Sequence, residues 1–418
     1  MKTNYIIITR CCIICTKAKD KMLSYKLRLY PTKTQESRLD DAIDSCRILY
    51  NDFIFESRLA YKEGYKLNFD ELQRMIPYMI PKDKVYSKAA QMVLWQFYNN
   101  LKVLSSLFKK GKRIGKLRFK PKSRYNSINY NQSGFKLLPD NILKLSKIGK
   151  IKCIVHRKIL GKIKEIHVKK EITGVWYSIA ICENEYKKSC SLLRKKITGI
   201  DVGINNYCYD SDGHVIKHPQ ILKNSEEKLK RSQRRLSRKV KGSSNRWKEK
   251  LRLAKIHQKI KYQRNDFLHK VSKYYVDNYD TIFVEDLKIQ NMVKNHHLAE
   301  SISDSSWNSF FQKLEYKAAN AGILFTKVAP HGTSQSCSNC GRIVKKTLAI
   351  RTHHCPYCGL VIDRDYNASL NIKQRGIDSL PMGCREVTPL ERIPLAMIQI
   401  DHGHVFSLNK ESDDSSRG

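Results

Sequence analysis

The segment Ile197-Thr-Gly-Ile-Asp-Val-Gly203 opens a run of three short apolar stretches. The second stretch is Asn206 to Asp210 and the third is Gly213 to Lys217, and turn-forming residues separate the three. Short stretches of this kind, joined by tight turns, are typical of an antiparallel meander. We expect Asp201 at the centre of the first strand, where its neighbours are small or apolar. A carboxylate in such a place is costly unless it is paired or bound to a metal ion.

Two further acids adjoin regular structure later in the chain. Glu285 ends the strand-like run Thr281-Ile-Phe-Val-Glu285, and Asp365 lies in the first turn of a helix that we expect from about Asp365 to Arg375. Taken singly, Asp201 can be a turn residue, Glu285 a strand-end charge and Asp365 a helix cap. Together they have the order of an RNase H-like nuclease, in which three carboxylates hold two divalent cations for phosphodiester hydrolysis. Oxygen ligands suit Mg²⁺ or Mn²⁺.

A second set of residues has the spacing of a zinc site. The pairs Cys337-Ser-Asn-Cys340 and Cys355-Pro-Tyr-Cys358 are 14 residues apart, and each is followed by a glycine. Two such pairs can place four thiolates around one Zn²⁺, and the closed set leaves no open position for catalysis. Redox dithiols are the alternative, but they normally occur singly in a thioredoxin-like context. We expect the neighbouring His353 and His354 to lie at the surface or to face nucleic acid.

The composition indicates a polyanionic partner. The 418 residues include 79 Lys and Arg against 39 Asp and Glu, a net charge of +40, and 41% of them are hydrophobic. The chain is therefore long and apolar enough for two to four packed units, and it repels itself unless a polyanion binds. Nucleic acid is the first candidate and an anionic membrane surface the second. The apolar run Tyr5 to Cys15 is interrupted by Arg10 and too short to span a membrane, so we expect a cytoplasmic, nucleoid-associated protein without a membrane partner.

The positive charge is concentrated in two segments. Residues 109 to 124 contain nine Lys or Arg and no acid, with Phe119 and Tyr125 interleaved. Residues 221 to 275 contain 19 Lys or Arg against four acids in a long helical pattern. Solvated loops and helix faces are the plain interpretation of both. The one-sided charge favours contact with phosphates, and aromatic rings can stack on bases.

The N-terminal half combines strands and helices. Leu23 to Tyr30 alternates apolar and polar residues, as a half-buried strand does. Amphipathic helices are expected from Thr34 to about Lys62 and from Lys88 to Phe108. Residues 137 to 190 contain short runs rich in Ile, Val and Tyr, which we expect to return as antiparallel strands beside the first one.

Motifs along the chain match those of one protein family. They are Gly199-Ile-Asp-Val-Gly-Ile-Asn-Asn206, Arg264-Asn-Asp-Phe-Leu-His-Lys270, Val284-Glu-Asp-Leu287, Thr333-Ser-Gln-Ser-Cys-Ser-Asn-Cys-Gly341 and Asp363-Arg-Asp-Tyr-Asn-Ala-Ser369. Tyr25-Lys-Leu-Arg-Leu-Tyr-Pro31 and Gly115-Lys-Leu-Arg-Phe-Lys120 look like its N-terminal signatures. On these motifs the chain resembles TnpB, the insertion-sequence proteins related to type V CRISPR effectors. The resemblance extends from about Met22 to Arg375.

The resemblance implies a function and its residues. TnpB proteins are regarded as RNA-guided DNA endonucleases encoded by transposable elements, with a guide RNA from the transposon end and a double-stranded DNA target beside a short adjacent motif. Carried over by motif, the catalytic, Mg²⁺-binding acids are Asp201, Glu285 and Asp365. Asp363 competes for the third place, but Asp365 to Asn367 fits the family pattern Asp-any-Asn. The zinc ligands carry over to Cys337, Cys340, Cys355 and Cys358.

The resemblance also implies a fold of α/β plus all-β class. An RNase H-like (RuvC) nuclease domain with an inserted zinc ribbon is expected after an N-terminal, wedge-like β-barrel with a helical recognition insert. The expected boundaries are 1–21 for an N-terminal extension, 22–190 for the barrel with its insert at about 34–110, 195–332 and 363–376 for the nuclease domain, 333–362 for the ribbon and 377–418 for a disordered tail.

Two other functions stay open at this point. A nuclease-silent relative could bind nucleic acid and regulate transposition or transcription, but a silenced copy should lack at least one of the three acids, and all three are present. A DDE-type transposase is the third possibility. It usually requires end-binding domains, which we do not find in the sequence.

Overall fold

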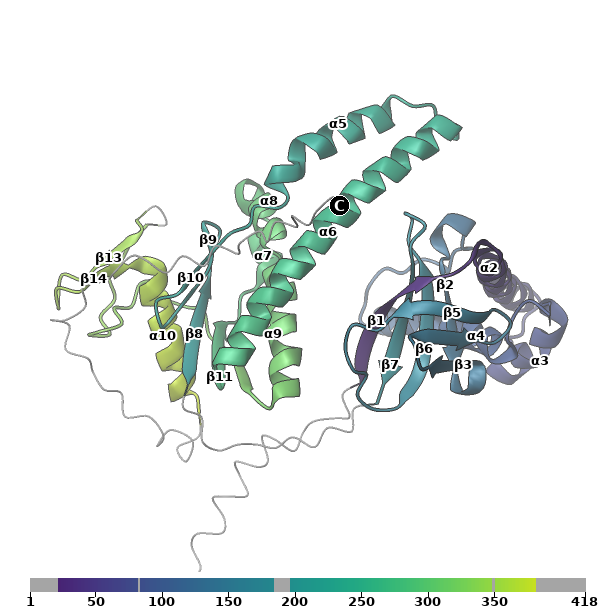
Figure 1. Ribbon diagram of the computed structural model, residues 1–418, viewed down its shortest axis with the longest axis horizontal. Coiled ribbons are helices and arrows are strands. Elements are labelled where there is room, and N and C mark those ends of the chain that lie inside the picture. Colours follow the sequence, from purple (N-terminus) through teal and green to yellow (C-terminus); the bar gives the residue numbers. More distant parts are fainter. Residues whose placement is uncertain (1–21, 82, 184–195, 348–349, 381–418) are drawn as a thin grey trace, which may run out of the picture. The chain divides into compact units, whose positions relative to one another are not determined.

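The computed structural model describes residues 22–81, 83–183, 196–347 and 350–380 (Figure 1). They form two compact units, whose described residues are 22–183 and 196–380. The expected extension 1–21 and residues 381–418 of the expected tail lie outside the described residues. Within the described part, none of the helices is both long and apolar enough to cross a membrane.

The N-terminal unit is built on a seven-stranded antiparallel sheet. The strand order is β2-β6-β7-β1-β5-β4-β3. In β1 (Leu23–Tyr30), Tyr25, Leu27 and Leu29 are buried, as the period-two pattern predicts. The edge strands β2 and β3 are separated only by the short turn Gln132–Gly134, so the sheet is nearly closed, and this is the part of the barrel expectation that the structure bears out. The other strands are β2 (Ser127–Asn131), β3 (Phe135–Leu138), β4 (Ile142–Leu145), β5 (Gly149–Ile154), β6 (Ile163–Lys170) and β7 (Trp176–Cys182).

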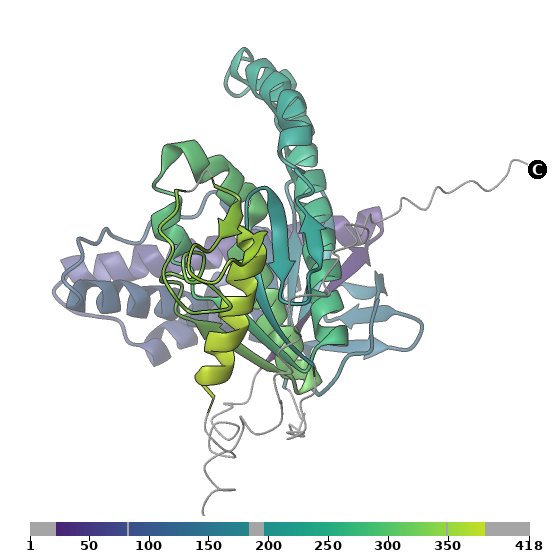
Figure 2. The same ribbon diagram turned by 90° about the vertical axis from the view of Figure 1, so that its left-hand side faces the viewer.

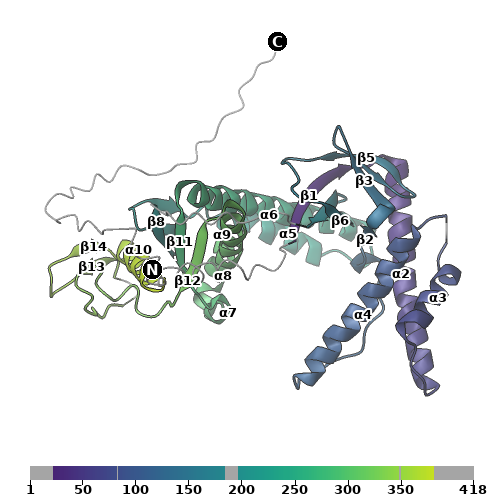
Figure 3. The same cartoon turned by 90° about the horizontal axis from the view of Figure 1, so that it is seen from below.

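Three helices lie between β1 and β2 in the sequence. They are α2 (Lys33–Lys62), α3 (Phe69–Met79) and α4 (Ser87–Lys109), and they extend away from the strands (Figure 3). Thr32 begins α2 with a capping box that Gln35 completes. The expected helices α2 and α4 are confirmed, and α3, which the sequence analysis does not predict, packs against both.

The C-terminal unit contains a mixed five-stranded sheet. Its order is β10-β9-β8-β11-β12, with β10, β9 and β8 antiparallel and β8, β11 and β12 parallel. The predicted meander is therefore confirmed. Asp201 is the penultimate residue of β8, so the expectation that it lies at the strand centre is wrong. The strands are β8 (Ile197–Val202), β9 (Asn206–Asp210), β10 (Val215–Lys217), β11 (Thr281–Glu285) and β12 (Leu324–Val328).

Helices cover both faces of this sheet. Ile282 and Val284 pack with α6 (Ser244–Asn278) and α9 (Trp307–Ala321), whereas Phe283 packs with α10 (Arg364–Asp378) on the opposite face (Figure 2). Helix α5 (Glu226–Ser237) runs beside the outer part of α6 as a helical hairpin (Figure 1). Smaller elements are α7 (Ile289–Met292), α8 (His296–Ser305), β13 (Thr352–His354), β14 (Val361–Asp363) and the 3₁₀ turns Lys122–Arg124 and Lys223–Ser225.

The end of α10 differs from the expectation. The helix continues to Asp378, so the tail expected from residue 377 does not begin there. Ile377 packs against the small core that contains Phe283 and Ile372, and this contact extends the helix past Gly376.

Candidate active site

Parallel pairing brings two of the predicted acids to the same sheet edge. The register pairs Thr281 with Ile197 and continues to Val284 with Ile200, so the next positions are Glu285 and Asp201. The two acids therefore lie at the carboxyl ends of neighbouring strands. Since Ile200 and Val284 face α6 and α9, side-chain alternation directs both acids toward α10.

Two glycines allow α10 to approach the sheet closely. A Cβ added at Gly199 would lie 2.4 Å from the backbone nitrogen of Lys373, and one at Gly376 would lie 2.1 Å from the ring of Phe283. Neither position therefore tolerates a side chain without movement of the helix. The close approach sets the first turn of α10, which contains Asp365, beside the end of β8.

Asp363 and Asp365 have different surroundings. Oδ1 of Asp363 accepts hydrogen bonds from the backbone nitrogens of Asp365 (2.7 Å) and Tyr366 (3.2 Å), so this carboxylate is the N-cap of α10. Asp365 is 9% exposed. One acid thus stabilises the helix end and the other turns inward toward the sheet.

The acids influence one another electrostatically. Burial, followed by the charges of Glu285 and Asp365, raises the pKa of Asp201 well above its usual value. Burial also raises the pKa of Glu285, and the Thr333 hydroxyl and the Arg375 charge counteract this effect. The fold thus holds like charges close together, an arrangement that a cation would relieve.

The sequence analysis did not single out three residues at this site. Thr333 donates a hydrogen bond from its hydroxyl to Oε1 of Glu285. Arg351 Nη1 lies 3.7 Å from Oδ2 of Asp365, and Arg364 Nε lies 3.5 Å from Oδ1 of the same carboxylate. Thr333 begins the motif that contains the first cysteine pair, and Arg364 separates Asp363 from Asp365. Their positions in these motifs are the sequence features that point to Thr333 and Arg364. No motif or periodic pattern points to Arg351.

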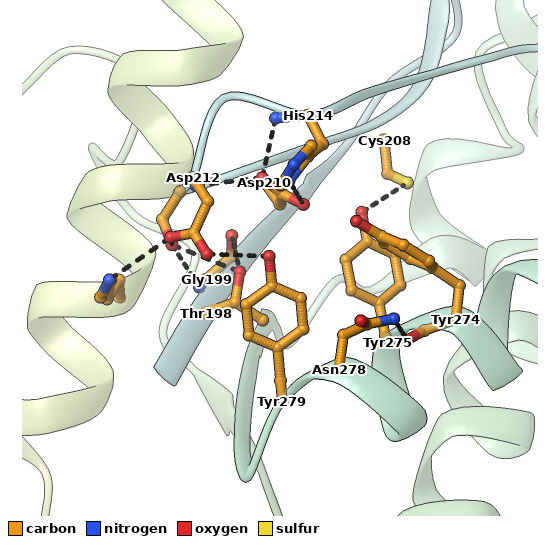
Figure 4. A network of polar contacts seen from close by, with 12 residues as sticks. Thr198, Gly199, Cys208, Asp210, Asp212, His214, Tyr274, Tyr275, Asn278 and Tyr279 are labelled. Atoms are coloured by element: carbon orange, nitrogen blue, oxygen red, sulfur yellow. Dashed lines mark hydrogen bonds and ion pairs between the residues drawn. The ribbon is translucent and has the colours of Figure 1, made fainter. Parts of the chain in front are cut away.

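A polar network lies around the first half of β8 and the turn between β9 and β10 (Figure 4). Ser211 Oγ accepts a hydrogen bond from the backbone nitrogen of Gly199 (3.2 Å). Asp212 accepts one from the Tyr279 hydroxyl (2.8 Å) and forms an ion pair with Lys373 (3.7 Å). These contacts tie β8, the β9–β10 turn, the residue after α6 and α10 together, so the elements carrying Asp201 and Asp365 are fixed relative to each other.

The four predicted zinc ligands form a separate cluster. The ligand atoms of Cys337, Cys340, Cys355 and Cys358 all lie within 4.8 Å of one another. The glycine after each pair has positive φ, and its backbone nitrogen bonds to the first cysteine's carbonyl oxygen, which closes the knuckle. A backbone hydrogen bond from Leu360 lowers the pKa of Cys358 to about 6, which favours a thiolate. The cluster fits one structural Zn²⁺.

Among the residues that the structure describes, the four cysteines are the only cluster of three or more His, Cys, Asp or Glu side chains whose ligand atoms lie close enough together to hold a metal ion. The three carboxylates influence one another electrostatically but do not form a second such cluster. The expectation for His353 is wrong, because its side chain is fully buried beside Lys346, whereas His354 is exposed as expected.

The cysteine cluster is attached directly to α10. Asn367 Oδ1 accepts a hydrogen bond from the backbone nitrogen of Ser338 (2.9 Å), and its Nδ2 donates to the carbonyl oxygen of Ser336 (2.8 Å). Asn371 Nδ2 donates to the carbonyl oxygens of Ser336 (2.7 Å) and Thr333 (2.8 Å). The ribbon therefore supports the helix that carries Asp365.

Comparison with known proteins adds a family to this geometry. A model described as "Probable transposase", of the IS605 OrfB type, matches residues 187–296, which contain Asp201 and Glu285. A "Cas12f1-like, TNB domain" model matches residues 307–372, which contain the cysteines and Asp365. A "Helix-turn-helix domain" model, again of the IS605 OrfB type, matches residues 22–66. The chain therefore contains domains of the TnpB/IS605 OrfB transposase family. Residues 22–66 form β1 and one continuous helix, α2, before the loop that follows it.

Curated relatives match over nearly the whole length. A putative RNA-guided DNA endonuclease of Streptomyces pristinaespiralis is 29% identical over 371 residues, 86% of this chain and 90% of the relative. The putative RNA-guided DNA endonuclease InsQ of Escherichia coli K12 is 29% identical over 408 residues, 91% and 99% of the two chains. The TnpB-like protein L79 of Acanthamoeba polyphaga mimivirus is 23% identical over 392 residues, 85% and 73%.

Proposed function

We propose that this protein is an RNA-guided DNA endonuclease of the TnpB type, encoded by a transposable element. The observation that carries the proposal is the convergence of Asp201, Glu285 and Asp365 on one face of the sheet. The strand order, with a three-stranded meander followed by two parallel strands, supports an RNase H-like (RuvC) arrangement. The near-full-length relatives named as endonucleases support the same activity.

The three carboxylates are the proposed holders of Mg²⁺ or Mn²⁺. Two such ions, when bound, supply Lewis-acid stabilisation and an activated water for phosphodiester hydrolysis. Asp201 interacts electrostatically with both of the other acids, because the charges of Glu285 and Asp365 each raise its pKa. Thr333 orients Glu285 and favours its ionised form. Asp365 is the proposed third acid, since both hydrogen bonds of Asp363 already serve the helix end.

The proposed partners are a guide RNA from the transposon end and double-stranded target DNA beside a short adjacent motif. The net charge of +40 and the basic face of α5 support polyanion binding. The relatives' names support RNA guidance in particular. Binding of RNA and DNA relies on charge outside the carboxylate site, so binding and cleavage can be separated by mutation.

A cleavage assay tests the proposal. Protein with its co-purified RNA, a DNA target matched to that RNA and Mg²⁺ should give cut DNA. Asp201→Ala, Glu285→Ala and Asp365→Ala should each lower the rate by about 10³-fold or more, because the three act as a unit, with RNA binding nearly unchanged. Asp277→Ala, on the exposed side of α6, is the matched control and should cleave normally.

Three results would change the proposal. Comparable cleavage by wild type and Asp201→Ala would show that the triad is misassigned. Loss of activity in Asp363→Ala with full activity in Asp365→Ala would exchange only the third acid. Binding of RNA and matched DNA by the wild type without any cleavage would favour the nuclease-silent regulator.

A further inference from the structure

The N-terminal unit contains a cavity of about 430 Å³ that lies away from its sheet. It is lined by α2, by the second half of α4, by the extended segment 115–121 and by Arg124. This segment belongs to the basic stretch that the sequence analysis singled out. The volume is in the range of small-ligand sites in proteins.

Side chains of α2 fix the extended segment in place. Asn51 donates from Nδ2 to the carbonyl oxygen of Lys120 (3.1 Å) and accepts from its backbone nitrogen at Oδ1 (2.7 Å). Arg47 reaches the same carbonyl oxygen (3.4 Å), and Arg58 donates to the carbonyl oxygen of Leu117. These three α2 residues share one helix face. Hydrogen bonds from α2 therefore fix this wall of the cavity, although the segment 115–121 is neither helix nor strand.

The lining combines cations with apolar surface. Lys116, Arg118, Lys120 and Arg124 contribute four positive charges, and no Asp or Glu is among the lining residues. The apolar surface that a ligand can reach comes from Val103 and Leu104 of α4 and from Phe119, which is 48% exposed. The lining therefore favours an anion together with a flat apolar group.

We propose that this cavity binds one unpaired nucleotide of a bound RNA or DNA strand. The base lies against the apolar wall, and the flanking phosphates contact Lys116, Arg118 and Arg124. Stacking and cationic contact together are how proteins hold single strands without reading sequence. A paired base cannot enter, because its faces are stacked in the duplex. The inference rests on the proposed function only in taking nucleic acid as the ligand.

A cavity-filling pair of variants tests the proposal. Val103 lines the cavity and is 58% exposed, whereas Ser106 is exposed on the same helix and does not line it. Full-length, RNA-free Val103→Trp and Ser106→Trp proteins are titrated with fluorescein-labelled 15-nucleotide oligouridylate, 15-nucleotide oligothymidylate and a 15-base-pair DNA duplex, all in EDTA. Val103→Trp should raise the Kd for a single strand about tenfold, and Ser106→Trp should change it less than about twofold.

The three probes identify the source of the nucleotide. A loss confined to oligouridylate assigns the cavity to RNA, and a loss confined to oligothymidylate assigns it to DNA. Duplex affinity should change less than about twofold in both variants. Equal single-strand affinities of Val103→Trp and Ser106→Trp would overturn the proposal, as would an equal loss for the duplex.

A second pair tests the charge without altering the cavity shape. Lys116→Gln with Arg118→Gln removes two charges from the lining, and Lys109→Gln with Lys112→Gln removes two from the neighbouring surface. The first pair should weaken single-strand binding at least about threefold more than the second. Equal losses would contradict the phosphate contacts. These titrations contain no Mg²⁺, so failure of the nuclease proposal would appear in the cleavage assay and leave this result unaffected.

Discussion

Asp201 is an acid whose ionisation in the candidate site lowers the stability of the fold. Burial and two neighbouring acids raise its pKa, so the folded protein binds this proton more tightly than the unfolded chain does. The proton's stabilising effect is fully present below the unfolded pKa of about 3.8 and is lost as the pH rises through the raised pKa. Without divalent cations, ionisation of this carboxyl therefore destabilises the fold.

The neutral variant Asp201→Asn should consequently melt at a higher temperature than wild type in EDTA at pH 8. A gain of about 1 kcal/mol corresponds to about 2–4 °C for a unit of this size. The difference should shrink as the pH is lowered, and MgCl₂ should raise the Tm of wild type more than that of the variant. Scanning calorimetry between pH 5 and 8 measures both effects. Asp277→Asn is the surface control, and an equal gain there would show that only net charge matters.

Thr333 is a positioning residue for Glu285. Its hydroxyl bond lowers the pKa of that carboxyl, which burial raises. Thr333→Val should therefore lower the cleavage rate up to about tenfold at pH 6 and much less at pH 8.5, because a larger share of Glu285 is protonated at the lower pH. Thr333→Ser keeps the hydroxyl and should restore the wild-type profile. A uniform loss at every pH would indicate a purely structural role.

At the scale of elements, the contact between β8 and α10 depends on the absence of a side chain at Gly199. An added methyl group would meet the backbone of Ser369 and Lys373, which cannot turn aside. Gly199→Ala should therefore destabilise the C-terminal unit by about 3 kcal/mol. Gly115→Ala, where nothing lies within 4 Å, is the matched control and should leave the Tm unchanged or slightly raised. Chemical denaturation of both variants measures the difference; equal stabilities would show that α10 can shift.

The helical hairpin of α5 and α6 lies within the longer of the two basic segments, residues 221–275. Lys228, Arg234, Arg235 and Arg238 are exposed. Changing all four to Gln should reduce the slope of log K against log salt for a DNA duplex by up to about 3–4, since each phosphate contact contributes about 0.9. The control removes four exposed lysines from strands β3 to β5: Lys136, Lys144, Lys150 and Lys152. An equal change of slope in the control would mean that the hairpin has no special contact.

Local pattern was sufficient for most elements but not for their pairing. The patterns of residues 23–30, 34–62 and 88–108 predicted the observed strand and helices. Helix α3 was missed because it is short and contains Pro77. The alignment of Asp201 with Glu285 follows from a parallel pairing across a long sequence separation, which periodicity does not encode.

In the candidate site, too, local sequence motifs indicated some residues, whereas others depend on how distant segments fold together. The motifs named the three acids and four cysteines by resemblance. Arg351 lies in a segment without a periodic pattern, and its approach to Asp365 depends on how the ribbon folds. The burial of His353 also comes from the ribbon's fold, because a three-residue strand such as β13 has too few residues to reveal which face is covered.

At the scale of the whole molecule, the cysteine cluster and the carboxylates form one mechanical unit through Asn367 and Asn371. Cys355→Ser should lower the zinc content from about one ion per chain. It should also lower the cleavage rate, although Cys355 is not one of the three carboxylates of the candidate site. Asn371→Ala breaks two of the links without touching a ligand, so it should retain zinc and lose part of the activity. Elemental analysis and cleavage rates on the same preparations test this. Full activity in zinc-free Cys355→Ser would contradict the coupling.

The order of the elements along the chain also affects when the protein becomes active during synthesis. Asp201 lies in the first strand of its unit and Asp365 in the last described helix. At about 5–20 residues per second, the ribosome therefore adds Asp365 about 10–30 s after Asp201. Until α10 emerges and packs against Gly199, the growing chain has an incomplete carboxylate set. Products of premature termination before α10 would therefore be unable to cut, and cleavage activity would arise only after α10 has been made.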